Sequence, residues 1–96
     1  MRRAAKVDRN QGQIVEALRK AGASVEPIFR LGRGIPDLLV GYRKVNTLIE
    51  VKDGEAPPSK RRLTPDEQDW HDAWRGQVCV VESPEEALRA IGAVKP

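Results

Sequence analysis

Residues 33–52 read RGIPDLLVGYRKVNTLIEVK and hold two short apolar runs that a polar connection separates. Asp37 comes directly before the first run, and Glu50 closes the second, with Lys52 two positions further on. Charged groups at the ends of such apolar strands are costly to bury unless a partner or a metal ion compensates them. These three residues therefore predict a functional site at one end of a strand pair.

The two strands are expected at residues 37–42 and 46–52, joined by a hairpin loop whose length the sequence leaves open. Alternate residues of a strand share a face, so Glu50 and Lys52 point the same way. Asp37 joins them only if paired residue numbers sum to an odd value, as a loop of two or four residues allows. A three-residue loop would turn Asp37 away, so the register tests the site.

Two carboxylates that lie close together repel each other, and a hard divalent cation relieves the repulsion by taking an oxygen ligand from each. Mg²⁺ usually keeps several waters, one of which could attack a phosphodiester. Lys52 could orient that water or offset charge that develops on the phosphate oxygens. In a plainer interpretation there is no site: Asp37 caps a turn, and Glu50 pairs with Lys52 on an exposed strand.

The rest of the sequence predicts a small α/β or α+β domain of order α-β-β-β-α-β-α, with a central mixed sheet flanked by helices. Glycine, proline and capping residues mark the boundaries. Besides the strand pair, the expected elements are a helix from residue 8 or 10 to Gly22, a strand at residues 23–29, a loop at residues 53–62, a helix opened by Thr64, a strand at residues 77–81 and a helix from Ser83 to Gly92.

A length of 96 residues suits one domain with one modest core. The formal net charge of +3 permits a nucleic-acid partner without requiring one. The one cysteine, Cys79, excludes a disulfide framework or a four-ligand zinc site within one chain, and it favours an intracellular location. No apolar stretch approaches the length of a membrane span, and no signal-peptide core is visible near the start.

Three segments together resemble the virus-type replication-repair nuclease (VRR-NUC) domain of the PD-(D/E)xK nuclease superfamily. They are residues 34–39 (GIPDLL), 49–52 (IEVK) and 63–67 (LTPDE), followed by Trp70. The resemblance covers about residues 7–92 of a single domain at 1–96 and extends to the small archaeal Holliday junction resolvases. It implies a restriction-endonuclease-like core and a nuclease activity.

The resemblance implies a metal-dependent DNA endonuclease that uses Mg²⁺ or Mn²⁺. Asp37 and Glu50 would bind the metal together with the main-chain carbonyl of Val51, and Lys52 would be the catalytic lysine. Branched DNA such as a four-way junction would be the substrate, and its two symmetric cuts would require a homodimer. The expected setting is the cytoplasm of a bacterium or of a phage-infected host. Two alternatives stay open: a nuclease that acts on flaps or plain duplex, and a catalytically weak DNA-binding module.

Two positions depart from the family pattern. The family has an acid on the first helix, and the matching position here is Gln11, whose uncharged amide could still hold a water. Gln11 could equally be the capping-box partner of Asp8. Glu67 stands where the family often has glutamine, so it either takes part in the site or only caps the helix that Thr64 opens.

Basic residues near the motif could neutralise DNA phosphates on either side of the site. Trp70 and Trp74 lie one helical turn apart and are expected in the core rather than as platforms for base stacking. The basic candidates are Arg2, Arg3, Lys6, Arg30, Arg33, Lys60, Arg61 and Arg62.

Overall fold

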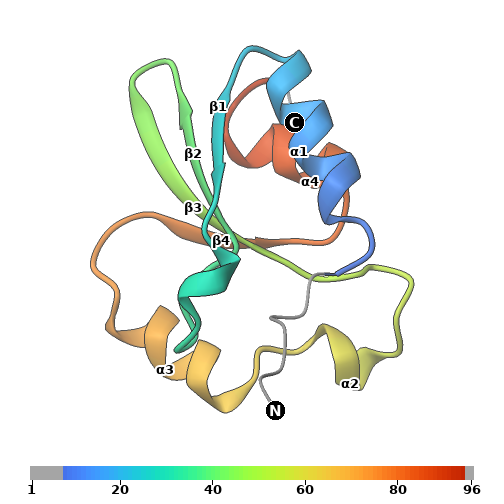
Figure 1. Cartoon of the computed structure of the whole chain (residues 1–96), viewed down its shortest axis with the longest axis vertical. Coiled ribbons are helices and arrows are strands. Elements are labelled where there is room, and N and C mark those ends of the chain that lie inside the picture. The colour runs from blue at the N-terminus through green and yellow to red at the C-terminus, as the bar shows by residue number, and fades with distance from the viewer. Residues whose placement is uncertain (1–7, 95–96) are drawn as a thin grey trace.

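The computed structural model of the chain describes residues 8–94 (Figure 1). Its elements confirm the α+β class with a mixed sheet, and they add two short pieces, η1 and α2, inside regions expected to be a strand end and loops. Val7, the expected start of the core, and the basic candidates Arg2, Arg3 and Lys6 lie outside the described residues. The elements are α1 (Gln11–Lys20), β1 (Ser24–Pro27), the 3₁₀ turn η1 (Phe29–Leu31), β2 (Leu38–Tyr42), β3 (Val45–Val51), α2 (Pro58–Arg61), α3 (Pro65–Ala73), β4 (Val78–Val81) and α4 (Pro84–Ala90).

The sheet has the spatial order β1-β2-β3-β4, with β3 and β4 parallel and the other pairs antiparallel. β1 is an edge strand, as its Pro27 predicts, since proline cannot donate to a neighbouring strand. β1 ends at Pro27 rather than at Phe29, which lies in η1 instead. The expected strand at residues 23–29 was therefore too long.

Helices α1 and α4 pack against each other and against the sheet, so one face of the sheet is covered (Figure 1). Alternate residues of β2 and β3 point into this layer and are buried, which follows from the period of two along a strand. The buried core residues are Ile14, Leu18, Ala23, Val25, Leu38, Val40, Ile49, Val51, Val81 and Ala87.

The hairpin between β2 and β3 turns through only two residues, Arg43 and Lys44, whose φ angles are +51° and +67°. Positive φ at both positions defines the type I′ turn, which usually carries Asn-Gly because L side chains disfavour this conformation. Leu38 pairs with Ile49, and the paired numbers sum to 87 along the whole ladder. This is the odd register that the site requires, and it carries Asp37 to the position opposite Glu50.

The N-termini of α1 and α3 are capped in different ways. At α3 the capping box is confirmed: the Thr64 hydroxyl accepts from the Glu67 amide, and the Glu67 carboxylate accepts from the Thr64 amide at 2.9 Å. At α1 the expected capping box of Asp8 and Gln11 is wrong, because the N-cap is Asn10, and its side chain makes no capping hydrogen bond. Asn10 instead donates its amide to the carbonyl oxygens of Lys52 and Glu82, which ties α1 to the ends of β3 and β4.

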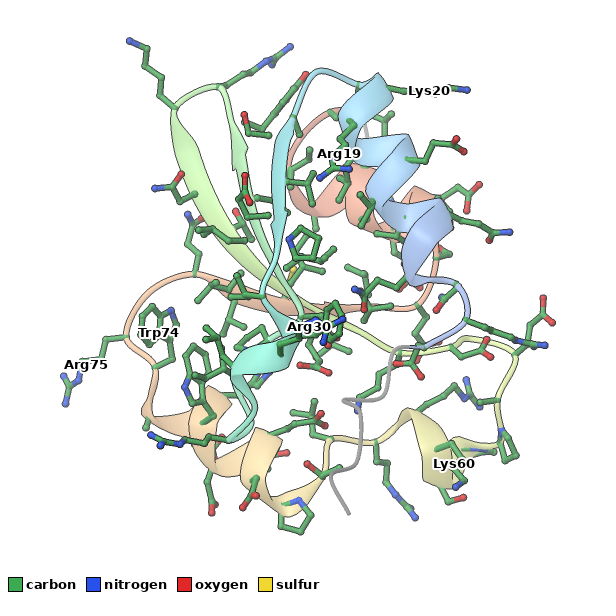
Figure 2. The ribbon with its side chains drawn as sticks, viewed as in Figure 1. Arg19, Lys20, Arg30, Lys60, Trp74 and Arg75 are labelled. Atoms are coloured by element: carbon green, nitrogen blue, oxygen red, sulfur yellow. The ribbon has the colours of Figure 1, made fainter. Side chains whose placement is uncertain are left out.

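Trp70 and Trp74 stack on each other with ring centroids 4.6 Å apart and planes 19° from parallel. Neither residue belongs to the core, and Trp74 is 46% exposed. Figure 2 shows Trp74 beside the turn that leads into β4, with Arg75 pointing away from the molecule. The expectation that both tryptophans are core residues is therefore wrong.

Within residues 8–94, none of the helices has the length and apolar character needed to cross a membrane.

Replacing Lys44 by glycine is expected to raise the free energy of unfolding by about 0.5–1 kcal/mol, because the left-handed conformation is costly for an L residue and free for glycine. Urea denaturation measures the change. The matched control is Lys44→Ala, which keeps the Cβ atom and should bring no gain. Equal stabilisation by alanine would mean that the side chain, not the backbone conformation, is the source of strain.

Candidate active site

Asp37 and Glu50 face each other at the end of the β2–β3 ladder that lies away from the turn. The two carboxyl groups are close enough to influence each other's pKa. Asp37 also accepts a hydrogen bond from the main-chain amide of Val51 at 2.8 Å, which fixes one of its oxygens. Glu50 is only 3% exposed, so the pair is held at the boundary between the core and an open hollow.

Lys52 places its ammonium group between two carboxylates. Its Nζ atom lies 2.7 Å from Oε1 of Glu67 and 3.8 Å from Oε2 of Glu50. Burial disfavours the charged ammonium, but the hydrogen bond and charge of Glu67 and the charge of Glu50 outweigh it and raise the pKa of Lys52. Lys52 therefore stays a cation at neutral pH.

These side chains line a hollow of about 480 Å³ to which four separate parts of the chain contribute. The segment before α1, the start of β2, the end of β3 and the start of α3 meet here, so residues far apart in the sequence become neighbours. Among the predicted site residues, the hollow collects both carboxylates, the lysine and Glu67, but not Gln11. Its lining residues are Asp8, Arg9, Asp37, Glu50, Lys52, Thr64 and Glu67.

The two facing carboxyl groups are hard to ionise together. Burial and the nearby charge of Asp37 raise the pKa of Glu50 to about 9. Burial also raises the pKa of Asp37, although the amide of Val51 opposes this shift. A cation bound between the two groups would favour the charged form of both.

Glu67 has two partners at once. The same oxygen, Oε1, accepts from the Thr64 amide and from Nζ of Lys52. Burial opposes ionisation of Glu67, but the hydrogen bonds from Lys52 and Thr64 outweigh it, and its pKa falls below the usual value. The two interpretations of Glu67 are therefore compatible: it caps α3, and it reaches the candidate site.

The sequence suggests Gln11 for the site and Asp8 for a helix cap, but in the structure Asp8 is the residue that lines the hollow. Gln11 is 4% exposed and does not line the hollow, and its buried Oε1 has no hydrogen-bond partner among the described residues. Asp8 lines the hollow, and burial raises its pKa. Sequence reasoning missed Asp8 because it was considered only as a helix cap; its position one helical turn before Gln11 is the signal that could have found it.

The donor set fits a hard divalent cation. Within residues 8–94, no group of three or more His, Cys, Asp or Glu side chains is arranged to hold a metal ion. Mg²⁺ does not need such a group, because it is typically bound by one or two carboxylates, with waters and substrate phosphates completing its shell. Asp37 and Glu50 supply that pair, and their mutual repulsion is what such an ion would relieve.

The basic candidates for DNA contact differ in their exposure and in whether an acid already pairs with them. Arg61 is half-buried and lies 3.6 Å from a carboxylate oxygen of Glu82, so part of its charge is already compensated. The others are exposed, and Figure 2 shows Arg30 on η1 and Lys60 on α2. Together with α3, these elements form the half of the molecule opposite the hairpin turn (Figure 1). The exposed candidates are Arg30, Arg33, Lys60 and Arg62.

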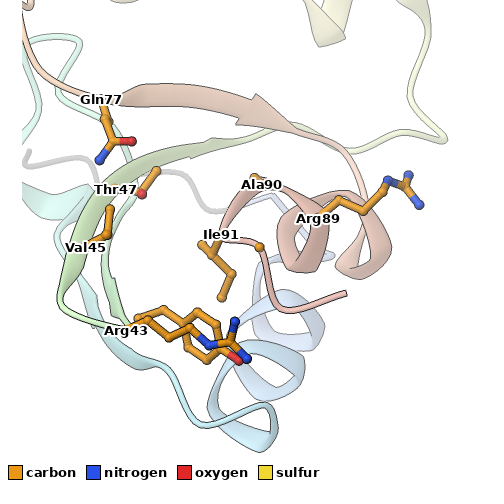
Figure 3. Close-up of a pocket in the computed structure, with 9 residues that line it drawn as sticks. Arg43, Val45, Thr47, Gln77, Arg89, Ala90 and Ile91 are labelled. Atoms are coloured by element: carbon orange, nitrogen blue, oxygen red, sulfur yellow. The ribbon is translucent and has the colours of Figure 1, made fainter. Parts of the chain in front are cut away.

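A separate hollow of about 380 Å³ lies at the turn end of the sheet, between the hairpin and the C-terminal end of α4 (Figure 3). Arg43 and Arg89 flank it, and Thr47 and Gln77 line its sheet side. None of its lining residues is an acid, so it offers no carboxylate to a metal ion. It is therefore no rival to the site at Asp37 and Glu50.

A solved structure described as a VRR_NUC domain is similar to this chain, with a TM-score of 0.61 and 28% sequence identity over 85% of this chain and 94% of that chain. No family model matches the sequence, and no curated protein matches it. This structural match supports a VRR-NUC domain.

Replacing Glu50 by glutamine is expected to stabilise the metal-free protein at alkaline pH. Because the pKa of Glu50 is raised from 4.5 to about 9, the folded protein keeps a proton there that the unfolded chain releases. Stability therefore falls as the pH rises through this range, and glutamine removes that part of the slope. The gain should be about zero near pH 4 and should grow by up to about 1.4 kcal/mol for each pH unit towards pH 9.

Urea denaturation in EDTA across this pH range checks the result. The control is Glu16→Gln, which removes an exposed carboxylate on α1 and should leave the slope unchanged. A Glu50→Gln variant with the slope of the parent protein would show that Glu50 ionises normally.

Proposed function

We propose that this chain is a metal-dependent DNA endonuclease that hydrolyses phosphodiester bonds. The observation that carries the proposal is the buried Asp37–Glu50 pair beside Lys52 in an open hollow of a VRR-NUC domain. The hollow is polar and is lined by four acids, which suits a cation and a bound phosphate better than an apolar ligand. DNA is the proposed partner.

Asp37 and Glu50 would hold the metal, Mg²⁺ or Mn²⁺, with the main-chain carbonyl of Val51 as a further ligand. When bound, the metal would activate water and neutralise charge on the scissile phosphate. Asp37 is suited to this task because the Val51 amide holds one of its oxygens in a fixed direction. Asp8, at the rim of the hollow, would supply the additional acid that the family pattern assigns to the position of Gln11.

Lys52 would stabilise the negative charge that develops on the phosphate oxygens. Its raised pKa keeps the ammonium charged at neutral pH, which suits electrostatic stabilisation and not proton abstraction. Glu67 would orient Lys52 through their contact of 2.7 Å. The exposed cations Arg30, Arg33, Lys60 and Arg62 would contact the DNA backbone, with a smaller part for the compensated Arg61.

The variants Asp37→Asn and Lys52→Ala are expected to lower the cleavage rate by at least about 100-fold while DNA binding persists, because each removes charge that acts in the transition state. The assay uses labelled four-way junction, flap and plain duplex DNA in Mn²⁺ and in Mg²⁺. Asp72→Asn, an exposed acid on α3, is the matched control and should cleave normally. If the parent protein binds DNA but cleaves it in neither metal, the alternative of a DNA-binding module is favoured.

Branched DNA, and a four-way junction in particular, is the proposed substrate, with a C2 homodimer as the working unit. Two symmetric cuts need two sites, and one chain of 96 residues supplies one. The sheet face opposite α1 and α4 supports this assembly, because it carries Leu39 and Val80, each 39% exposed. Leu39 and Leu48 also line an open groove with Trp74, so the exposed apolar surface is continuous. An uncovered apolar surface of this kind is typical of an interface.

Replacing Leu39 by lysine is expected to convert the dimer to a monomer, because the charge would be repeated on both subunits across a self-complementary face. Gel filtration with light scattering measures the mass. Leu31→Lys is the matched control, since Leu31 is 60% exposed but lies on η1, away from this sheet face. A parent protein that stays monomeric with and without junction DNA would contradict the homodimer.

A further inference from the structure

Trp70 and Trp74 form a rigid aromatic stack outside the core, which calls for a role other than core packing. Each ring borders a different hollow: Trp74 lines the apolar groove on the sheet, and Trp70 lines a separate hollow of about 430 Å³. Trp74 stacks on one face of Trp70, so that face is already supported by an aromatic ring. A supported ring of this kind is a suitable platform for stacking.

The hollow beside Trp70 combines this aromatic ring with one cation and two acids, Arg33, Asp66 and Asp69. Arg33 is a non-glycine residue in the left-handed conformation, with φ of +58°, between two glycines that also have positive φ. Non-glycine residues in this region are strained and cluster at functional sites. The turn thus holds Arg33 at the hollow in a conformation that its type disfavours.

The turn is also packed directly on α3. A Cβ atom at Gly34 would collide with the main chain of Asp66, so only glycine permits this approach. The contact fixes Arg33 relative to the helix that carries Trp70. The walls of the hollow are therefore set by backbone packing before any ligand arrives.

We propose that this hollow binds an unpaired nucleobase of the DNA substrate, stacked on Trp70, next to the scissile phosphodiester. The proposal rests on the nuclease function proposed above and names the feature of DNA that the site recognises. Two acids against one cation disfavour a phosphate in the hollow, whereas carboxylates accept hydrogen bonds from the amino groups of bases. A base inside a duplex cannot reach such a platform, so the nucleotide is unpaired.

The hollow and the candidate active site share the first turn of α3 as a wall. Asp66 lines the hollow, and the next residue, Glu67, lines the active site. On the other side, Gly34 packs on Asp66, and Asp37 follows three residues later. A strand whose phosphate lies at Asp37 would have a neighbouring nucleotide within reach of Trp70, so this base would favour cleavage beside a branch point.

The test measures binding in the Asp37→Asn background by fluorescence anisotropy, with a duplex that carries an unpaired flap and the same duplex fully paired. Adding Trp70→Ala should weaken flap binding by roughly 10- to 100-fold, as expected for one stacked base, and leave the paired duplex unchanged. Trp70→Phe should retain most of the preference. Trp74→Phe, which keeps an aromatic ring behind Trp70, is the control and should lose much less.

A double-mutant cycle with the DNA sharpens the test. An abasic nucleotide at the first unpaired position should weaken flap binding to the Asp37→Asn protein by the same factor, and it should cause no further loss in the Trp70→Ala variant. Additive losses, or equal losses for Trp70→Ala and Trp74→Phe, would overturn the assignment of the hollow. If the parent protein cleaves DNA but shows no preference for an unpaired base, the nucleobase site fails and the nuclease stands; if it cleaves no DNA at all, the proposed function fails.

Discussion

The register of the β2–β3 hairpin is the constraint on which the rest of the structure depends. The turn at Arg43 and Lys44 leaves no slack between the strands, and the ladder then pairs every residue up to Leu38 and Ile49. One further step along the ladder brings Asp37 opposite Glu50. The same alternation that buries Leu38 and Ile49 under the helices turns the two carboxylates to the opposite face. Core packing and site geometry therefore depend on the same register, because a slip of one residue would turn the acids towards the core and the apolar residues away from it.

Around this pair the ionisable side chains form a chain of contacts. Asp37 faces Glu50, Glu50 lies near Lys52, and Lys52 is held by Glu67. The acid pair without a cation is electrostatically unfavourable, while the lysine is over-supplied with acids. A cation placed between the two carboxylates would relieve the repulsion between them.

Features that depend on neighbouring residues could be predicted from the sequence, whereas features that depend on the tertiary arrangement could not. The Thr64-Pro65 start of α3 and the alternation of the central strands are written in neighbouring residues, so both were predictable. The loop length was not, because Arg-Lys replaces the Asn-Gly signal of a two-residue turn. The place of Asp8 in the hollow depends on how the segment before α1 crosses the end of β3, which no local pattern encodes.

The tryptophans show a different limit of sequence reasoning. Two aromatic residues one helical turn apart suggest a buried stripe, but neither ring belongs to the core of this molecule. Trp70 and Trp74 instead pack against each other. Their spacing was informative about mutual contact and uninformative about burial.

The double duty of the Glu67 carboxylate makes α3 a sensor of the site. One oxygen holds both the first turn of the helix and the ammonium of Lys52, so a change at Lys52 alters the hydrogen bond that the Thr64 amide donates. The magnetic resonance signals of that amide and its exchange with solvent thus report on events in the hollow. A spectroscopist could follow occupancy there by watching the backbone, without attaching any label to the protein.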